Sequence, residues 1–240
     1  MKTASISVII PTYQHGQTIG QCLESIFFQT LQPKEVIVVN DGSTDQTLEV
    51  LESFKNKIIL INQENQGNQR ARNRGFEASS GDFVLFCDAD IVMRPDMLEK
   101  MYEKIERHPE VSYVYSRFRF GWKKFSSFPF DPARLERMNY IHTTSLIRHD
   151  HFPGFDENIK KFQDWDIWLS LLSQGHIGVF IPDELFRILD VKGRLGISKW
   201  LPKYAYKIPW RYFYWRPWRI KSYEQGREII LKKHGLLEKY

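Results

Sequence analysis

Short apolar runs alternate with helix-length amphipathic segments over the first 110 residues of the chain. Four of these runs, residues 6–10, 35–39, 58–61 and 83–86, are rich in β-branched or aromatic residues and almost uninterrupted. Such runs are typical of parallel strands that are buried on both faces. The alternation of strands with helices predicts an α/β fold in which helices flank a mostly parallel sheet.

The predicted helices of this region carry their apolar residues on one face, at a period near that of the α-helix. These positions are Ile19, Leu23, Ile26 and Phe27 in the first helix, Leu48, Leu51 and Phe54 in the second, and Met97, Met101 and Ile105 in the third. Residues 43–46 (Ser-Thr-Asp-Gln) have the spacing of a capping box, which predicts the start of the second helix there. Pro95 suits the first position of the third helix, where an N–H would have no partner.

The pattern changes after residue 110. Residues 111–115 and 143–147 are predicted strands, and an irregular stretch at residues 117–142 separates them. A helix is predicted at residues 164–173 because its apolar residues lie on one face: Trp165, Trp168, Leu169 and Leu172. We therefore expect one domain over residues 1–190, followed by a distinct C-terminal segment.

Composition and cysteine content are those of a globular protein from a reducing compartment. With 240 residues, 42% hydrophobic and 26% charged, the chain is able to bury a large core. Cys22 and Cys87 both lie in apolar segments, so no disulfide framework is expected. The sequence shows neither a signal peptide nor an apolar stretch of the roughly 18 residues needed to span a bilayer. We expect a cytoplasmic location.

The positive charge is concentrated in the C-terminal segment, residues 191–240. Residues 191–223 contain nine Lys or Arg and no Asp or Glu, and aromatic residues interleave with them. The formal net charge of +5 therefore leaves 5 − 9 = −4 for the rest of the chain. Two interpretations stay open: docking of residues 191–223 on an anionic membrane surface, or packing of the rings on the domain with the charged ends in water.

Three polar clusters follow predicted strands: Pro11-Thr12-Tyr13, residues 40–43, and Asp88-Ala89-Asp90. In open parallel sheets, ligands bind beyond the carboxyl ends of the strands. These clusters are therefore expected to share one rim, which suits a nucleoside. Tyr13 is placed to stack on a base, and Asp41 to accept hydrogen bonds from a base or a ribose.

The Asp88-Ala89-Asp90 sequence has the spacing of a cation site. Mg²⁺ and Mn²⁺ take oxygen ligands, usually one or two carboxylates with phosphate oxygens. Two Asp residues after a buried strand suit one carboxylate on a metal and the other on a ribose. The alternative is a turn in which the Asp side chains cap backbone amides.

Six motifs in a fixed order give the chain a resemblance to a known family. They are residues 7–13 (SVIIPTY), 41–45 (DGSTD), 71–75 (ARNRG), 88–90 (DAD), 154–157 (GFDE) and 164–166 (DWD). The set resembles the family 2 inverting glycosyltransferases of the GT-A fold, over about residues 5–190. The resemblance implies a nucleotide-sugar-binding half at about 1–110 and an acceptor half at 111–190.

The same resemblance implies an activity, a cofactor and partners. The activity is transfer of a sugar from a nucleotide-diphosphate sugar, foremost a UDP-sugar, to a hydroxyl of a saccharide or lipid-linked acceptor. A divalent metal, Mn²⁺ or Mg²⁺, is the expected cofactor, and no nucleic acid is expected as a partner. Carried over by position, the family roles are nucleotide binding by Pro11, Thr12, Tyr13, Asp41, Arg72 and Asp88, metal binding by Asp90, and general base catalysis by Asp164.

The proposed role of Asp164 also has a physical basis. An inverting displacement needs a carboxylate opposite the leaving diphosphate to take the acceptor proton. A carboxylate in the first turn of a helix is favoured in its ionised form by the helix dipole, whereas desolvation by Trp165 and Trp168 opposes that charge. The alternative is that Asp164 is only a helix-terminal carboxylate and that the tryptophans belong to the core.

Several positions depart from the family pattern. Asn40 and Gln163 stand where acidic residues are usual, Phe152-Pro153-Gly154 replaces a Gly-Gly pair, and Leu189-Asp190 follows Arg187 where a His is often found. These departures motivate an alternative function, a catalytically silent nucleotide-sugar-binding module. A nucleotidyltransferase is disfavoured because the expected Gly-rich, Lys-containing loop after the first strand is absent.

Overall fold

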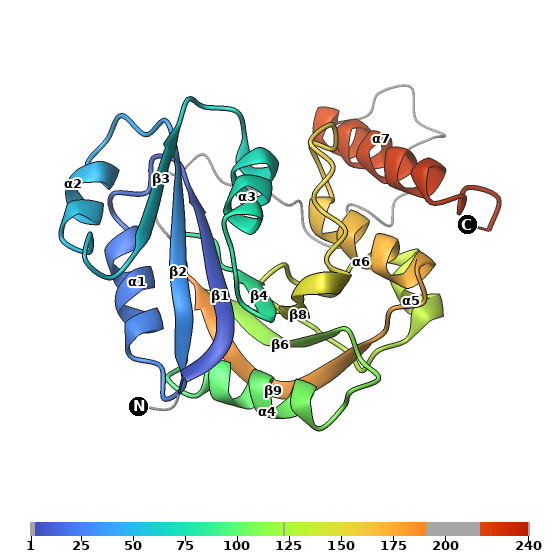
Figure 1. Cartoon of the computed structure of the whole chain (residues 1–240). Helices are drawn as coiled ribbons and strands as arrows, with labels where there is room; N and C mark the ends of the chain where they lie inside the picture. Colours follow the sequence, from blue (N-terminus) through green and yellow to red (C-terminus); the bar gives the residue numbers. More distant parts are fainter. Residues whose placement is uncertain (1–2, 122, 191–216, 240) are drawn as a thin grey trace.

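The computed structural model describes residues 3–121, 123–190 and 217–239 (Figure 1). Within these residues, nine strands form one mixed sheet, ordered β3-β2-β1-β4-β8-β6-β9-β5, with β7 paired to β6. Helices cover both faces of this sheet. The expected α/β class is therefore confirmed.

One half of the sheet is parallel, as the apolar runs predict. It contains β1 (Thr3–Thr12), β2 (Gln32–Asp41), β3 (Ile59–Gln63) and β4 (Phe83–Phe86). Strand β1 lies between β2 and β4, and all three neighbouring pairs are parallel. The strand order reverses between β1 and β4, which is the position at which open sheets bind ligands.

The other half of the sheet is mixed. It contains β5 (Ile91–Met93), β6 (Tyr113–Phe120), β7 (Lys123–Lys124), β8 (Leu146–Arg148) and β9 (Gly178–Ile188). The predicted strand at residues 111–115 corresponds to the start of β6, whereas only the end of the predicted strand at 143–147 is extended. Strands β5 and β9, and a helix within the stretch expected to be irregular, α5 (Pro132–Arg137), were not predicted.

Four helices match the predicted segments: α1 (Ile19–Phe27), α2 (Thr47–Glu52), α4 (Met97–Glu106) and α6 (Gln163–Ser173). Helices α3 (Asn68–Glu77) and α7 (Trp218–Lys233), and a 3₁₀ turn at His149–His151, are additional to the helices predicted from apolar positions. Pro95 precedes α4 by two residues instead of occupying its first position. A Cβ added at Gly75 would overlap Ile9, so this glycine allows α3 to approach the sheet closely.

The predicted capping box at residues 43–46 is wrong. Helix α2 begins at Thr47, and Asp45 accepts a hydrogen bond of 3.0 Å from the Thr47 amide. The Ser43 hydroxyl accepts instead from the Gln14 amide, at 3.1 Å. Residues 43–46 therefore form the turn that ties the loop after β2 to the loop after β1.

Alternation along the central strands divides the core between the two faces of the sheet. Val8 and Ile10 of β1 pack with α1 and α4, whereas Ile9 of the same strand packs with the aromatic residues of α6. Successive strand residues point to opposite faces, and here both faces are covered. This double burial explains why the strand sequences are continuously apolar.

Helix α7 packs on the domain beside α6 (Figure 1). Ile230 and Leu231, with Leu236 beyond the helix, are buried in the core cluster of α6. Residues 191–216, which carry most of the basic and aromatic positions of the C-terminal segment, lie outside the described residues, so membrane docking stays a prediction. Among the helices that the structure describes, none is both long enough and apolar enough to cross a bilayer.

Candidate active site

The loop after β1 places an exposed ring at the rim of the sheet. Pro11 and Thr12 are buried, and Tyr13 is 46% exposed. The Thr12 hydroxyl oxygen has no hydrogen-bond partner among the described residues, although it is buried at the carboxyl end of β1. An exposed aromatic ring beside an unsatisfied buried hydroxyl fits the predicted nucleoside position.

Asp41 is buried at the end of β2, where its carboxylate holds the loop between β3 and α3. It accepts hydrogen bonds from the Gln63 side-chain amide at 2.7 Å, from the Gln66 amide at 2.8 Å and from the Gly67 amide at 2.9 Å. Asn40, where the family usually has Asp, donates to Asn62 at 3.0 Å. Asp41 is therefore at the predicted rim, with both oxygens engaged by its own loop.

The buried Arg72 pairs with the partly exposed Asp88 at the rim. The Arg72 side chain is 3% exposed, and its Nη2 lies 2.5 Å from Oδ1 of Asp88. Arg72 projects from α3, and Asp88 follows β4, so the pair joins a helix to the switch point of the sheet. The sequence predicted both residues at the nucleotide but not their contact.

Electrostatics around Arg72 bring three predicted site residues together. Burial disfavours the charge of Arg72, but Asp88, Asp164 and Asp90 more than offset this effect and raise its pKa. The pKa of Asp88 shifts in the opposite direction: burial alone would raise it, but the Arg72 guanidinium, with a smaller contribution from His142, outweighs this effect and lowers it. Carboxylates from the DxD sequence and from α6 thus both stabilise the charge of Arg72.

Phe155 and Asn73 complete the surroundings of Arg72. The Arg72 guanidinium carbon lies 5.0 Å from the centre of the Phe155 ring. The Asn73 side chain donates to the Phe155 carbonyl at 2.9 Å and accepts from its amide at 2.8 Å. Asn73 belongs to the motif at residues 71–75, and Phe155 belongs to the motif at residues 154–157. Their two hydrogen bonds join these motifs beside Arg72.

Asp164 lies in the first turn of α6, half-buried, with the two neighbouring tryptophans in the core. The Trp165 indole donates to the Leu135 carbonyl at 2.6 Å, and the Trp168 indole donates to the Ile141 carbonyl at 3.0 Å. The core interpretation of the tryptophans is therefore confirmed. These hydrogen bonds hold α6 to the segment at residues 135–141.

Comparison with known proteins agrees with this geometry. The model of glycosyl transferase family 2 matches residues 7–161, which include the strand ends, Arg72 and both Asp residues of the DxD sequence. The chain belongs to glycosyl transferase family 2. Family membership thus confirms the resemblance expected from the six motifs.

Two bacterial proteins illustrate the relation of this family 2 chain to its relatives. Glycosyltransferase GlyA of Streptococcus pneumoniae is 42% identical over 162 residues, which cover 66% of this chain and 21% of GlyA. Glycosyltransferase YwdF of Bacillus subtilis is 33% identical over 179 residues, which cover 68% of this chain and 66% of YwdF. The chain therefore corresponds to only part of the length of GlyA.

Solved structures share the fold of the family 2 chain. Residues 1–349 of S. aureus TarS, in complex with UDP, superpose with a TM-score of 0.67 at 22% identity, covering 79% of this chain and 61% of that one. Mannosyltransferase PcManGT from Pyrobaculum calidifontis, in complex with GDP-Man and Mn²⁺, superposes with a TM-score of 0.59 at 20% identity, covering 80% and 58%. These likenesses confirm the expected GT-A type fold.

The carboxylates of the family 2 site suit a divalent metal ion whose remaining ligands come from the diphosphate of a substrate. Within the described ranges, no three His, Cys, Asp or Glu side chains gather in a way that could hold a metal ion. Asp88 is engaged by Arg72, so Asp90 is the DxD carboxylate suited to a metal. Mg²⁺ and Mn²⁺ commonly use one or two carboxylates and complete their shell with water and phosphate oxygens.

Loss of the buried Arg72 charge should destabilise the fold. We expect Arg72→Met to lower the free energy of unfolding at pH 7 by about 1–3 kcal/mol, because Asp88, whose side chain is 23% exposed, would keep a charge without its partner. Arg70→Met is the matched control. Its exposed guanidinium lies 3.9 Å from Glu157, and such a pair contributes about 0–1 kcal/mol.

The destabilisation by Arg72→Met should depend on pH. The lowered pKa of Asp88 means that its paired charge stabilises the fold fully above the unfolded-state pKa of about 3.9, and that this stabilisation is lost as the pH falls through the folded-state value. Urea unfolding at pH 7 and below pH 4 measures the gap between wild type and variant. A gap that stays constant or widens in acid would contradict the pairing.

Proposed function

We propose that the chain is an inverting glycosyltransferase that moves a sugar from a nucleoside-diphosphate donor to an acceptor hydroxyl. The observation that carries this proposal is the buried Arg72 guanidinium, with Asp88 in contact and with Asp90 and Asp164 close enough to raise its pKa. One cation at the carboxyl ends of β1 and β4 suits a diphosphate. The Asp90 carboxylate suits a metal, and the Asp164 carboxylate suits proton transfer.

In the proposed reaction, the oxygen of the acceptor hydroxyl attacks the anomeric carbon and the bond to the diphosphate breaks. Asp164 accepts the proton of that hydroxyl. The Arg72 guanidinium is charged at neutral pH, and carboxylates that raise its pKa further stabilise that charge, so it is able to orient the diphosphate. Asp88 is held by Arg72 on the ribose side of the donor, and Tyr13 offers its exposed ring to the base. A divalent cation bound by Asp90 would neutralise the charge that develops on the leaving diphosphate.

The donor is proposed to be a UDP-sugar. Support comes from structural neighbours, since S. aureus TarS has been solved with UDP and with UDP-GlcNAc, although PcManGT holds GDP-Man. Asp41 is proposed to contact the base, which requires one of its loop hydrogen bonds to be exchanged for the ligand. The acceptor is proposed to be a saccharide or lipid-linked hydroxyl.

Residues 191–223 are proposed to bring such an acceptor within reach at an anionic membrane surface. Their nine basic residues support this, because each Lys or Arg near an anionic leaflet contributes about 1 kcal/mol. Binding of the chain to liposomes should increase with anionic lipid and weaken with salt. Co-sedimentation that is indifferent to both would exclude electrostatic docking.

A panel of nucleotide sugars, each with and without Mn²⁺, tests the proposed function. The chain should hydrolyse one donor slowly in water and transfer its sugar faster to a suitable acceptor. A silent binding module would instead show thermal stabilisation by nucleotide sugar without any turnover. Failure of every donor both to bind and to react would contradict the proposal altogether.

Removal of the proposed metal ligand should abolish metal-dependent donor binding. We expect Asp90→Ala to lose the part of the affinity for nucleotide that depends on Mn²⁺, because the other DxD carboxylate, Asp88, is already paired with Arg72. Asp82→Ala is the control, an exposed Asp that precedes the other end of β4. Calorimetry measures both, and an unchanged affinity in Asp90→Ala with Mn²⁺ would disprove the metal assignment.

Replacement of the proposed base should separate binding from turnover. Asp164→Asn keeps the size of the side chain but removes its basicity, so donor affinity should stay near normal while turnover falls roughly 10²–10⁴-fold. Asp150→Asn, at an almost fully exposed carboxylate, should leave turnover unchanged. Steady-state kinetics decide the question, and full activity of Asp164→Asn would place the base elsewhere.

A further inference from the structure

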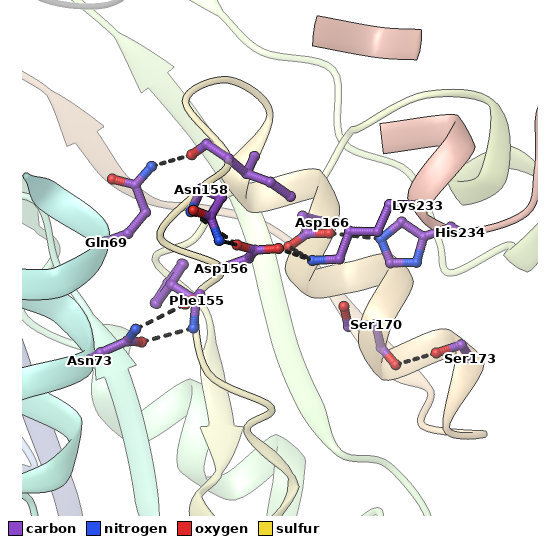
Figure 2. A network of polar contacts seen from close by, with 11 residues as sticks. Gln69, Asn73, Phe155, Asp156, Asn158, Asp166, Ser170, Ser173, Lys233 and His234 are labelled. Carbon is purple, nitrogen blue, oxygen red and sulfur yellow. Dashed lines mark hydrogen bonds and ion pairs between the residues drawn. The ribbon is translucent and has the colours of Figure 1, made fainter. Parts of the chain in front are cut away.

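A second carboxylate of α6, that of Asp166, is held by residues at the end of the C-terminal helix. Asp166 is buried, and its two oxygens lie 2.9 Å from Lys233 Nζ and 2.8 Å from His234 Nε2. Figure 2 shows the Lys233 and His234 side chains converging on Asp166 from α7. Lys233 also lies 2.8 Å from Asp156, so one ammonium group joins two carboxylates.

The start of α6 depends on such external ties. Its first turn follows Phe162, a non-glycine residue with φ of 61°, and no side chain caps the helix. Tyr223 of α7 packs edge-on against the Phe162 ring at 5.2 Å. A Cβ added at Gly226 would lie 3.1 Å from that ring, so the glycine lets α7 approach closely.

The same network reaches the residues around Arg72. Asp156, which Lys233 binds, follows Phe155, whose ring packs on the Arg72 guanidinium. Asn73 holds the Phe155 backbone from α3 (Figure 2). The end of α7 therefore contacts both segments that border the buried cation: the first turn of α6 and the loop at residues 154–157.

We propose that His234 and Lys233, through Asp166, are positioning residues that fix the direction of Asp164 toward the reacting hydroxyl. This inference rests on the proposed function. Asp164 and Asp166 are two residues apart in one helical turn, so their side chains leave the helix on nearly opposite sides. The contacts of Lys233 and His234 with Asp166 therefore restrict rotation and fraying of the helical turn that carries Asp164.

Substitutions at His234 separate positioning from folding. His234→Leu removes the donor to Asp166, whereas His234→Gln keeps a donor of similar reach. Lys239→Gln is the matched control, because it removes a different tie between the C-terminus and the domain, the exposed ion pair with Glu136 at 3.1 Å. Each variant is assayed for kcat, for the donor KM, and for hydrogen exchange in peptides covering residues 163–166.

The expected result is a loss of kcat of roughly 10- to 100-fold in His234→Leu, the range for a misplaced reacting group. The donor KM should stay within about twofold, because donor contacts come from other elements. Hydrogen exchange in residues 163–166 should become faster. His234→Gln should restore most of kcat, and Lys239→Gln should match wild type in every measurement.

Unchanged kcat in His234→Leu would overturn the inference. Equal losses of kcat in His234→Leu and Lys239→Gln, in proportion to lowered melting temperatures, would overturn it too. If His234→Leu does not fold, Lys233→Met provides the same test. This variant removes one partner of Asp166 and keeps the His234 contact, which supports folding. A wild-type chain that transfers no sugar would contradict the proposed function instead. In that case, unchanged exchange in residues 163–166 would overturn the anchoring as well, and faster exchange would support it.

Discussion

The buried guanidinium of Arg72 is the charge around which the rim of the sheet is arranged. A cation removed from water is costly unless carboxylates compensate it, and here Asp88 touches it while Asp90 and Asp164 add to its stabilisation. Two segments far apart in the sequence therefore contribute the carboxylates that offset the cost of burying Arg72. At this position a diphosphate would meet the Arg72 cation, the carboxylate proposed to bind metal and the proposed base.

Much of this arrangement could be predicted because the relevant signals are local. Continuous apolar runs identify the four parallel strands, and the rule that ligands bind at strand ends places Asp41 and the DxD sequence at one rim. Strand β9 was not predicted because Pro182, Asp183 and Glu184 interrupt its apolar residues. Helix α5 had a usable signal, since Asp131 caps it and Pro132 follows.

The contacts that define the site are less predictable because they join distant segments. Nothing near residue 72 in the sequence indicates that Arg72 pairs with Asp88 or that Phe155 covers it. Lys233 and His234 lie among many C-terminal basic residues, and only the fold shows that they face Asp166. The family motifs thus identify residue types for binding and chemistry, while the supporting contacts come from tertiary packing.

Crystals grown with a nucleoside diphosphate and Mn²⁺ would test the central claim most directly, because manganese can be located by its anomalous scattering. The account predicts one manganese peak at the Asp90 carboxylate, shared with diphosphate oxygens, with the Arg72–Asp88 pair beside the diphosphate. Manganese or nucleotide bound away from the carboxyl ends of β1 and β4 would contradict it. So would a diphosphate at this rim that leaves Asp90 without metal.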